Sequence, residues 1–265
     1  MRLASETRRG LSVLTVVTFL ALGPAGCGGD APEAAPASAI PVTSTAPPSS
    51  DARSALAGLA ALGLDRRYAA LYRLDVGDGA PRDVVATVAT DGSWRVDIPR
   101  GAQAGTADVS VVRTAAGVYV CSLPSVTNPV TSSCVRVAEK GEKVPRRYDP
   151  KVQRLFRQWL TVFTDRQSAL AVTAVQPLEG AQGSCFSVDS VSASLDAPVD
   201  VGVYCYSADG LLTAARVEYG VLTLVSQVAG PATVQLPGVE VSGEPLGTTS
   251  PSPAPQPSYS LAPPA

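Results

Sequence analysis

Histidine is absent from the 265 residues of this chain. Its absence excludes Ser-His-Asp and Cys-His catalysis, imidazole metal ligands and a histidine-based pH switch. Charged residues are also sparse, at 17% of the chain, and the net charge of −2 lacks the basic surplus typical of nucleic-acid-binding proteins. We therefore expect no nucleic-acid partner.

Other marks of catalysis or metal binding are equally scarce. The three lysines, Lys140, Lys143 and Lys151, suit a charged, solvated connection better than a catalytic dyad. Several aspartates stand near predicted turns, where Asp is favoured for local hydrogen bonding. The sequence contains no C-x-x-C pair and no glycine-rich phosphate loop. It predicts a protein that is not an enzyme and that needs no cofactor or metal.

The chain begins with the features of an export signal. Residues 1–26 combine an Arg-rich start with the apolar run Leu11–Leu22, which is too short to span a bilayer comfortably. Small residues precede Cys27 and two glycines follow it, so the segment resembles a bacterial lipoprotein processing site. That resemblance implies that Cys27 is acylated, for example with palmitate, and becomes the new N-terminus. An ordinary secretory signal with an incidental cysteine, or an uncleaved anchor, is the alternative, because Pro24 stands where the lipoprotein pattern has leucine.

Two segments have compositions that cannot bury a core. Residues 27–51 are rich in Ala, Pro, Ser and Thr, and residues 243–265 are rich in Pro and Ser. We expect a disordered tether with a reach of roughly 25–30 Å and a disordered tail. The predicted folded domain is residues 52–242.

One amphipathic helix organises the folded domain. The pattern predicts it over Asp149–Phe163, with Asp149 as N-cap and Pro150 at the first helical position. Its apolar residues recur at helical spacing: Val152, Leu155, Phe156, Trp159, Leu160 and Phe163. A shorter helix is predicted over Ala52–Leu64. The large apolar stripe must be buried against a sheet.

Period-two segments on both sides of this helix predict short antiparallel strands. They fall at 68–76, 83–90, 93–99, 108–113, 117–122 and 134–138 before the helix, and at 171–178, 184–190, 199–207, 211–219, 221–228 and 233–236 after it. The order indicates an α+β fold with one large antiparallel sheet. Clean alternation, as in Trp94, Val96 and Ile98, predicts one apolar face and one solvated face.

Four cysteines remain after Cys27, two in each block of strands. Pairing within a block gives Cys121–Cys134 and Cys185–Cys205, each bridge stabilising by about 3 kcal/mol. A four-cysteine zinc site is the alternative, and it belongs to reducing compartments.

Aromatic residues make up only 5% of the chain, so small side chains must fill a large sheet. Unfilled apolar volume either costs stability or receives an apolar ligand. The alternative is an ordinary, well-packed core. The residues expected to line a lipid cavity are Trp94, Val96, Ile98, Leu155, Phe156, Trp159, Phe163, Val201, Val203, Val217 and Tyr219.

In layout, the chain resembles the LolA/LolB-like lipoprotein-carrier superfamily, including LppX- and LprG-type exported lipoproteins. The similarity covers roughly residues 55–240 and rests on segments such as Tyr68–Arg73, Asp91–Pro99, Cys185–Val188 and the central helix. It implies a curved antiparallel half-barrel with the amphipathic helix packed in or over its concave face.

The same resemblance implies a function. We expect a lipid-anchored protein on the extracytoplasmic face of the bacterial membrane that binds or carries lipid or lipoprotein acyl chains. One alternative is a module of the RseB type that senses envelope stress or binds an envelope protein. An enzyme acting on envelope polymers is a further alternative.

Overall fold

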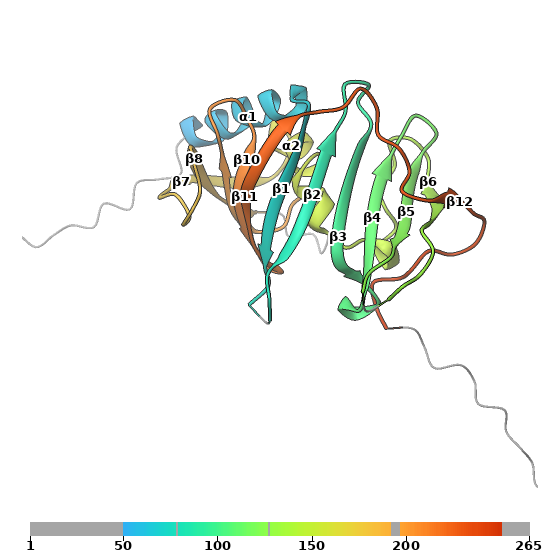
Figure 1. The fold of residues 1–265 in the computed structure, drawn as a ribbon. Coiled ribbons are helices and arrows are strands. Elements are labelled where there is room, and N and C mark those ends of the chain that lie inside the picture. The colour runs from blue at the N-terminus through green and yellow to red at the C-terminus, as the bar shows by residue number, and fades with distance from the viewer. Residues whose placement is uncertain (1–49, 78, 127, 192–196, 251–265) are drawn as a thin grey trace, which may run out of the picture. The chain divides into compact units, whose positions relative to one another are not determined.

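The strands form one open, curved, mostly antiparallel sheet (Figure 1). This computed structural model describes residues 50–77, 79–126, 128–191 and 197–250. Within these ranges the sheet has 12 strands in the order β12-β6-β5-β4-β3-β2-β1-β11-β10-β9-β8-β7. The strands are β1 Tyr68–Asp75, β2 Arg82–Val88, β3 Trp94–Ala102, β4 Ala107–Arg113, β5 Val118–Leu123, β6 Ser133–Ala138, β7 Leu170–Val175, β8 Ser184–Ser190, β9 Gly202–Tyr206, β10 Leu212–Val217, β11 Gly220–Ala229 and β12 Val239–Glu240. The predicted α+β class with one large sheet is confirmed.

The two blocks of strands join through β1. It pairs antiparallel with β2 on one side and with β11 on the other, so the last long strand returns to the first. The predicted strand at 233–236 was wrong. Pro231 and Pro237 flank this stretch and lack a backbone N–H, and the Val234 N–H donates to the Ser93 hydroxyl at 3.0 Å. The final strand is β12, which pairs parallel with β6.

The predicted central helix is buried as expected but is not continuous. It divides into a 3-10 helix, η3 Val152–Leu155, and the α-helix α2 Gln158–Thr164. The break lies at Arg157, whose φ of −138° is not helical, and Lys151, with φ 67°, separates Asp149 and Pro150 from η3. All six apolar residues of the stripe are nevertheless buried.

The prediction that Asp149 caps this helix was wrong. Its carboxylate accepts hydrogen bonds from the Lys151 N–H at 2.8 Å and from the Gln153 amide at 2.6 Å, and it pairs with the Arg154 guanidinium. These contacts form a local turn and not the first turn of a helix. Hydrogen bonds from neighbouring groups to an Asp side chain compete with the backbone hydrogen bonds of a helix.

The main core lies between the sheet and the helices. α1 Ser50–Asp65 buries Ala52, Leu56 and Ala60 there. Beside them lies the wedge, which is formed by the buried side chains of the helical segment: Val152, Leu155, Phe156, Trp159, Leu160 and Phe163. Aromatic contacts join the wedge to the strands: Tyr72 meets Phe156 at 5.0 Å, and Phe163 meets Tyr204 at 5.1 Å between ring centroids. The wedge therefore fills the concave side.

The opposite face is not simply solvated, contrary to the prediction. It carries two smaller clusters, one around Cys121–Cys134 and one around Cys185–Cys205. Both predicted disulfides are present. The first cluster is closed by Val234 from the C-terminal segment, which crosses this face. Disulfides are typical of extracytoplasmic proteins.

The ends of the described chain differ slightly from the predicted domain limits. α1 starts at Ser50, inside the predicted tether. At the other end Gly247 and Thr248 exchange backbone hydrogen bonds with Gln103, Ala104 and Arg147, so part of the predicted tail lies on the fold. The signal peptide and Cys27 lie outside the described residues. Among the described helices, none has the length and apolarity needed to cross a membrane.

Candidate functional site

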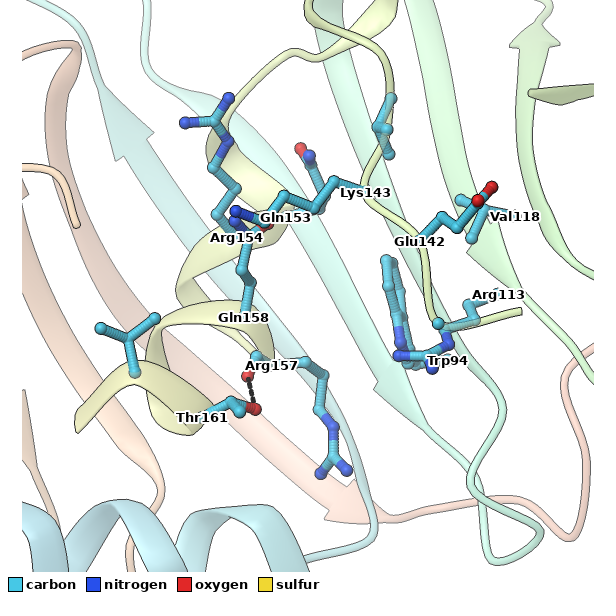
Figure 2. A pocket seen from close by; sticks show the side chains of 13 residues that line it. Trp94, Arg113, Val118, Glu142, Lys143, Gln153, Arg154, Arg157, Gln158 and Thr161 are labelled. Atoms are coloured by element: carbon cyan, nitrogen blue, oxygen red, sulfur yellow. Dashed lines mark hydrogen bonds between the residues drawn. The ribbon is translucent and has the colours of Figure 1, made fainter. Parts of the chain in front are cut away.

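A cleft of about 430 Å³ separates the helical segment from strands β3, β4 and β5 (Figure 2). This volume lies in the range of small-molecule sites. The lining combines apolar and cationic side chains: Trp94, Arg113, Val118, Gly141, Glu142, Lys143, Val144, Gln153, Arg154, Arg157, Gln158, Thr161 and Val162. Such a lining suits an amphipathic ligand better than a purely apolar one.

Strand register builds one side of the cleft. Trp94 on β3 pairs with Arg113 on β4, and Arg113 pairs with Val118 on β5, so the three side chains form a row on the concave face. Figure 2 shows the Trp94 indole beside the Arg113 side chain. Trp94 is only 9% exposed, and its indole nitrogen Nε1 has no hydrogen-bond partner. The wall of the cleft therefore contains a buried donor without a partner.

The other side comes from η3, α2 and the residues between them. Arg154 is neutralised by its ion pair with Asp149, and its guanidinium carbon lies 5.6 Å from the centroid of the Trp159 ring. Arg157 donates from Nη1 to the Leu64 carbonyl at 2.7 Å. Its remaining donors reach towards the sheet (Figure 2).

Arg157 lies in an unfavourable electrostatic environment. Burial lowers the pKa of its guanidinium, and the positive charges of Arg67 and Arg113 lower it further. Tyr68 and Asp65 act in the opposite direction, and Asp65 has the smallest effect of these groups. Two half-buried arginines that repel one another are stabilised by any anion placed between them.

A connecting loop covers the cleft near Arg113. A Cβ on Gly141, at φ 99°, would lie 4.0 Å from Arg113 Nη2, so the loop backbone passes close to this guanidinium. Lys143 extends from the same loop towards Gln153 and Arg154 (Figure 2). Glu142 is the one acidic residue in the lining, and its carboxylate already accepts a hydrogen bond from the Glu139 N–H at 2.8 Å.

A second pocket, of about 700 Å³, lies next to this cleft and shares Lys143, Arg154 and Gln158 with it. Its lining includes Trp159 and Asp200, whose buried Nε1 and Oδ2 atoms lack hydrogen-bond partners of ordinary geometry. Burial raises the pKa of the Asp200 carboxyl, while Arg154 and Lys151 lower it.

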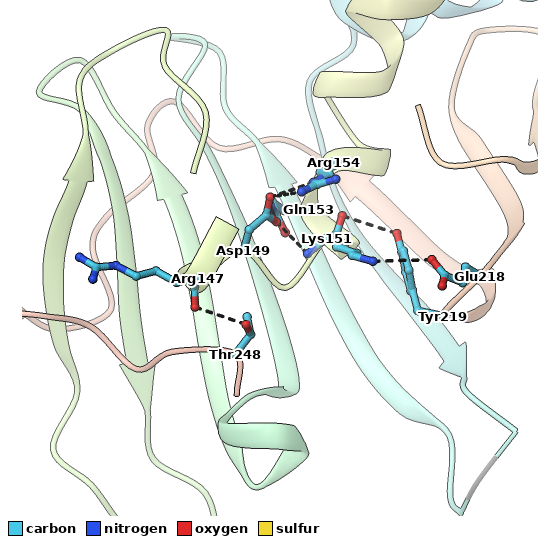
Figure 3. Close-up of polar contacts among 8 residues, drawn as sticks. All are labelled: Arg147, Asp149, Lys151, Gln153, Arg154, Glu218, Tyr219 and Thr248. Atoms are coloured by element: carbon cyan, nitrogen blue, oxygen red, sulfur yellow. Dashed lines mark hydrogen bonds and ion pairs between the residues drawn. The ribbon is translucent and has the colours of Figure 1, made fainter. Parts of the chain in front are cut away.

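Asp149 and Lys151 lie in the lining of the second pocket and take part in the polar contacts drawn in Figure 3. Lys151 Nζ lies 3.6 Å from the carboxylate of Glu218, and the Tyr219 hydroxyl donates to the Lys151 carbonyl at 3.5 Å. Lys151 thus ties the start of the helical segment to the end of β10. Tyr219 is partly buried against the core.

The structure places most predicted cavity residues in a packed core. Buried in the main cluster are Trp94, Val96, Ile98, Leu155, Phe156, Trp159, Phe163 and Val217. Of these, Trp94 lines the cleft and Trp159 lines the second pocket. The alternative of an ordinary, well-packed core therefore describes the concave face better than an empty cavity.

Two of the residues that were predicted to line the cavity do not lie on the concave face of the sheet. Val201 is 53% exposed, and Val203 packs beside the Cys185–Cys205 cluster on the opposite face. The larger Tyr204 and Tyr206 take the inward positions of β9, because burying aromatic rings removes more apolar surface from water.

The cations of the cleft were missed by sequence reasoning. Arg113 follows Val109 and Val111 in the same period-two pattern, so the alternation itself places an arginine on the apolar face. Lys143 was predicted to be solvated, and it lines the cleft from an exposed loop. Among the described residues, no group of three or more His, Cys, Asp or Glu side chains is placed to hold a metal.

Comparison with known proteins adds only a distant likeness. No protein-family description and no curated protein matches the chain. Among solved structures, one titled "Crystal structure of MucB" is similar, at 14% sequence identity and a TM-score of 0.38. The match covers 77% of this chain and 67% of that one. At this level the likeness carries no conclusion about activity.

Proposed function

We propose that this chain is an exported lipoprotein, anchored through an acylated Cys27, that binds lipid or lipoprotein acyl chains in the cell envelope. It acts by binding and not by catalysis. The observation that carries the proposal is the wedge of apolar side chains on η3 and α2, which lies beside an open cleft of mixed apolar and cationic lining.

An acyl chain that enters the concave side displaces side chains of the wedge, and its own contacts offset the contacts that are lost. α2 packs most closely on α1 and η3, and side chains such as Phe156, Trp159 and Phe163 fill the space towards the sheet. A hydrocarbon chain offers comparable dispersion contacts and equally removes apolar surface from water. Because the helical segment is interrupted at Arg157, its two parts can shift separately.

Fluorescence quenching tests this proposal, because the chain has two tryptophans in different places. Trp94→Phe leaves Trp159, which is 3% exposed, as the only reporter. We expect phospholipid with brominated acyl chains to quench Trp159 in this variant, since contact quenching requires the chain to enter the wedge. The full-length chain should also carry Cys27→Ser, so that its own anchor cannot interfere.

Three controls sharpen this experiment. The same lipid without bromine should leave the emission intensity nearly unchanged. Quenching confined to the Trp159→Phe variant, in which Trp94 remains, would place the acyl chain in the cleft but outside the wedge and would contradict the proposed entry into the wedge. The anchor is tested separately, because Cys27→Ser should move the protein from the membrane fraction to the soluble fraction.

A further inference from the structure

The cleft contains more unpartnered positive charge than a site for a neutral lipid requires. Arg113 and Lys143 make no side-chain hydrogen bond or ion pair within the described part of the chain. Arg154 is matched by Asp149, and Glu142 is the only acidic lining residue. Counting Arg113, Lys143 and Arg157 against Glu142 leaves the cleft with a surplus of two positive charges.

The geometry of these groups favours one kind of partner. Trp94 Nε1 is a buried donor without an acceptor, and the Arg113 guanidinium is its cross-strand neighbour. Arg157 lines the same cleft from the helical side, with its Nη1 already bonded to the Leu64 carbonyl. The cleft wall thus combines an unpartnered donor with unpaired cations, and an oxyanion can accept from such groups.

We propose that Arg113, Trp94 and Arg157, with Lys143 at the edge, bind the phosphate or carboxylate group of an anionic lipid whose acyl chain enters the wedge. This inference rests on the proposed function and names the class of its ligand. The anionic group lies against the wall formed by Trp94 and Arg113, and the exposed Lys143 lies between it and bulk water. The apolar chain continues towards Phe156 and Trp159.

The test compares lipids with identical acyl chains and different head groups. Brominated phosphatidylglycerol, brominated diacylglycerol and a brominated fatty acid are titrated into the Trp94→Phe, Cys27→Ser chain, and quenching of Trp159 gives the affinity. Trp94→Phe removes one of the proposed donors, so the comparison is repeated on the Cys27→Ser chain that keeps Trp94. In this second assay, each lipid displaces a bound fluorescent fatty acid, and the loss of its fluorescence gives the affinity. We expect the anionic lipids to bind about tenfold or more tightly than diacylglycerol, as expected for a charged hydrogen bond.

Substitution of Arg113 identifies the group responsible. Arg113→Gln should weaken binding of the anionic lipids about tenfold and leave diacylglycerol unchanged. The matched control is Arg73→Gln, which removes one exposed arginine from the opposite face of the same sheet and should change neither affinity. If Arg113→Gln does not fold, Lys143→Gln on the exposed loop tests the same preference.

The outcomes separate this inference from the proposed function. Equal quenching by all three lipids, unchanged in Arg113→Gln, would overturn the head-group assignment while acyl-chain binding stands. Quenching by none of them would overturn both. Binding of soluble glycerol phosphate, seen as a shift of Trp94 emission and without lipid uptake, would show a site for a free anion and would also overturn the assignment.

Discussion

A single residue, Arg113, places a positive charge in the apolar lining of the cleft. It ends β4 on the face that Val109 and Val111 bury, so strand alternation brings a guanidinium to the edge of an apolar core. This position was readable from the sequence, because the period of two fixes which face a residue takes. The opposite error at Val201 and Val203 arose because alternation alone does not say which face is the core.

Asp200 offers a test at the same scale. Burial raises the pKa of its carboxyl above the usual 3.8, so the folded state favours the neutral acid. This contribution to stability is fully present below the unfolded-state pKa and is lost as the pH rises through the raised folded value. Asp200→Asn, which stays neutral, should therefore stabilise the protein at pH 7. The gain should be less than about 1 kcal/mol, since solvent screens this half-buried group.

Thermal unfolding between pH 3 and pH 8 measures this effect. The gain from Asp200→Asn should vanish at low pH, where Asp200 itself is protonated. The control Asp189→Asn, on an exposed position of β8, should stay within about 0.5 kcal/mol of the unmodified protein throughout. If Asp200→Asn destabilises at pH 7, the attraction of Arg154 and Lys151 outweighs burial.

At the scale of elements, the strands were predictable and the helix break was not. β4 and β8 match their predicted ranges closely because turn residues bound them. The break between η3 and α2 lies at Arg157, whose guanidinium donates to the Leu64 carbonyl, a contact from outside the segment. Within the segment, the Asp149 carboxylate is occupied by Gln153 and Arg154. Helical periodicity reports only which residues are buried, and all six were buried as predicted.

Phe156 tests how firmly the wedge is packed. It is 2% exposed and meets Tyr72 at 5.0 Å. Phe156→Ala should lower the free energy of unfolding by about 3–5 kcal/mol, since the rigid sheet cannot collapse around the space that is left. Denaturant unfolding measures this loss, with the exposed Val225→Ala as a control near zero. A loss below about 1 kcal/mol would mean that the wedge is loosely packed before any ligand enters.

At the scale of the whole molecule, the domain combines a filled concave face with a charged opening. The sequence predicted one large antiparallel sheet, the disulfides and the buried stripe, because these depend on periodicity and on cysteine spacing, whereas the curvature was implied by the family resemblance. It left open whether the helical segment fills the concavity or covers a cavity, since packing depends on how far the sheet curves. The cationic cleft also escaped prediction, because its members are brought together from β4, the 139–144 loop and the helical segment.

Native mass spectrometry of the protein purified from cell envelopes tests the central claim most directly. The full-length chain carrying Cys27→Ser should be used, so that any acyl group detected is a bound ligand and not the anchor. We predict a second species heavier by the mass of one phosphate- or carboxylate-bearing lipid, which collisional activation releases as an anion. A spectrum that contains only the unliganded chain, from gentle conditions and without detergent exchange, would contradict lipid binding as the function of this protein.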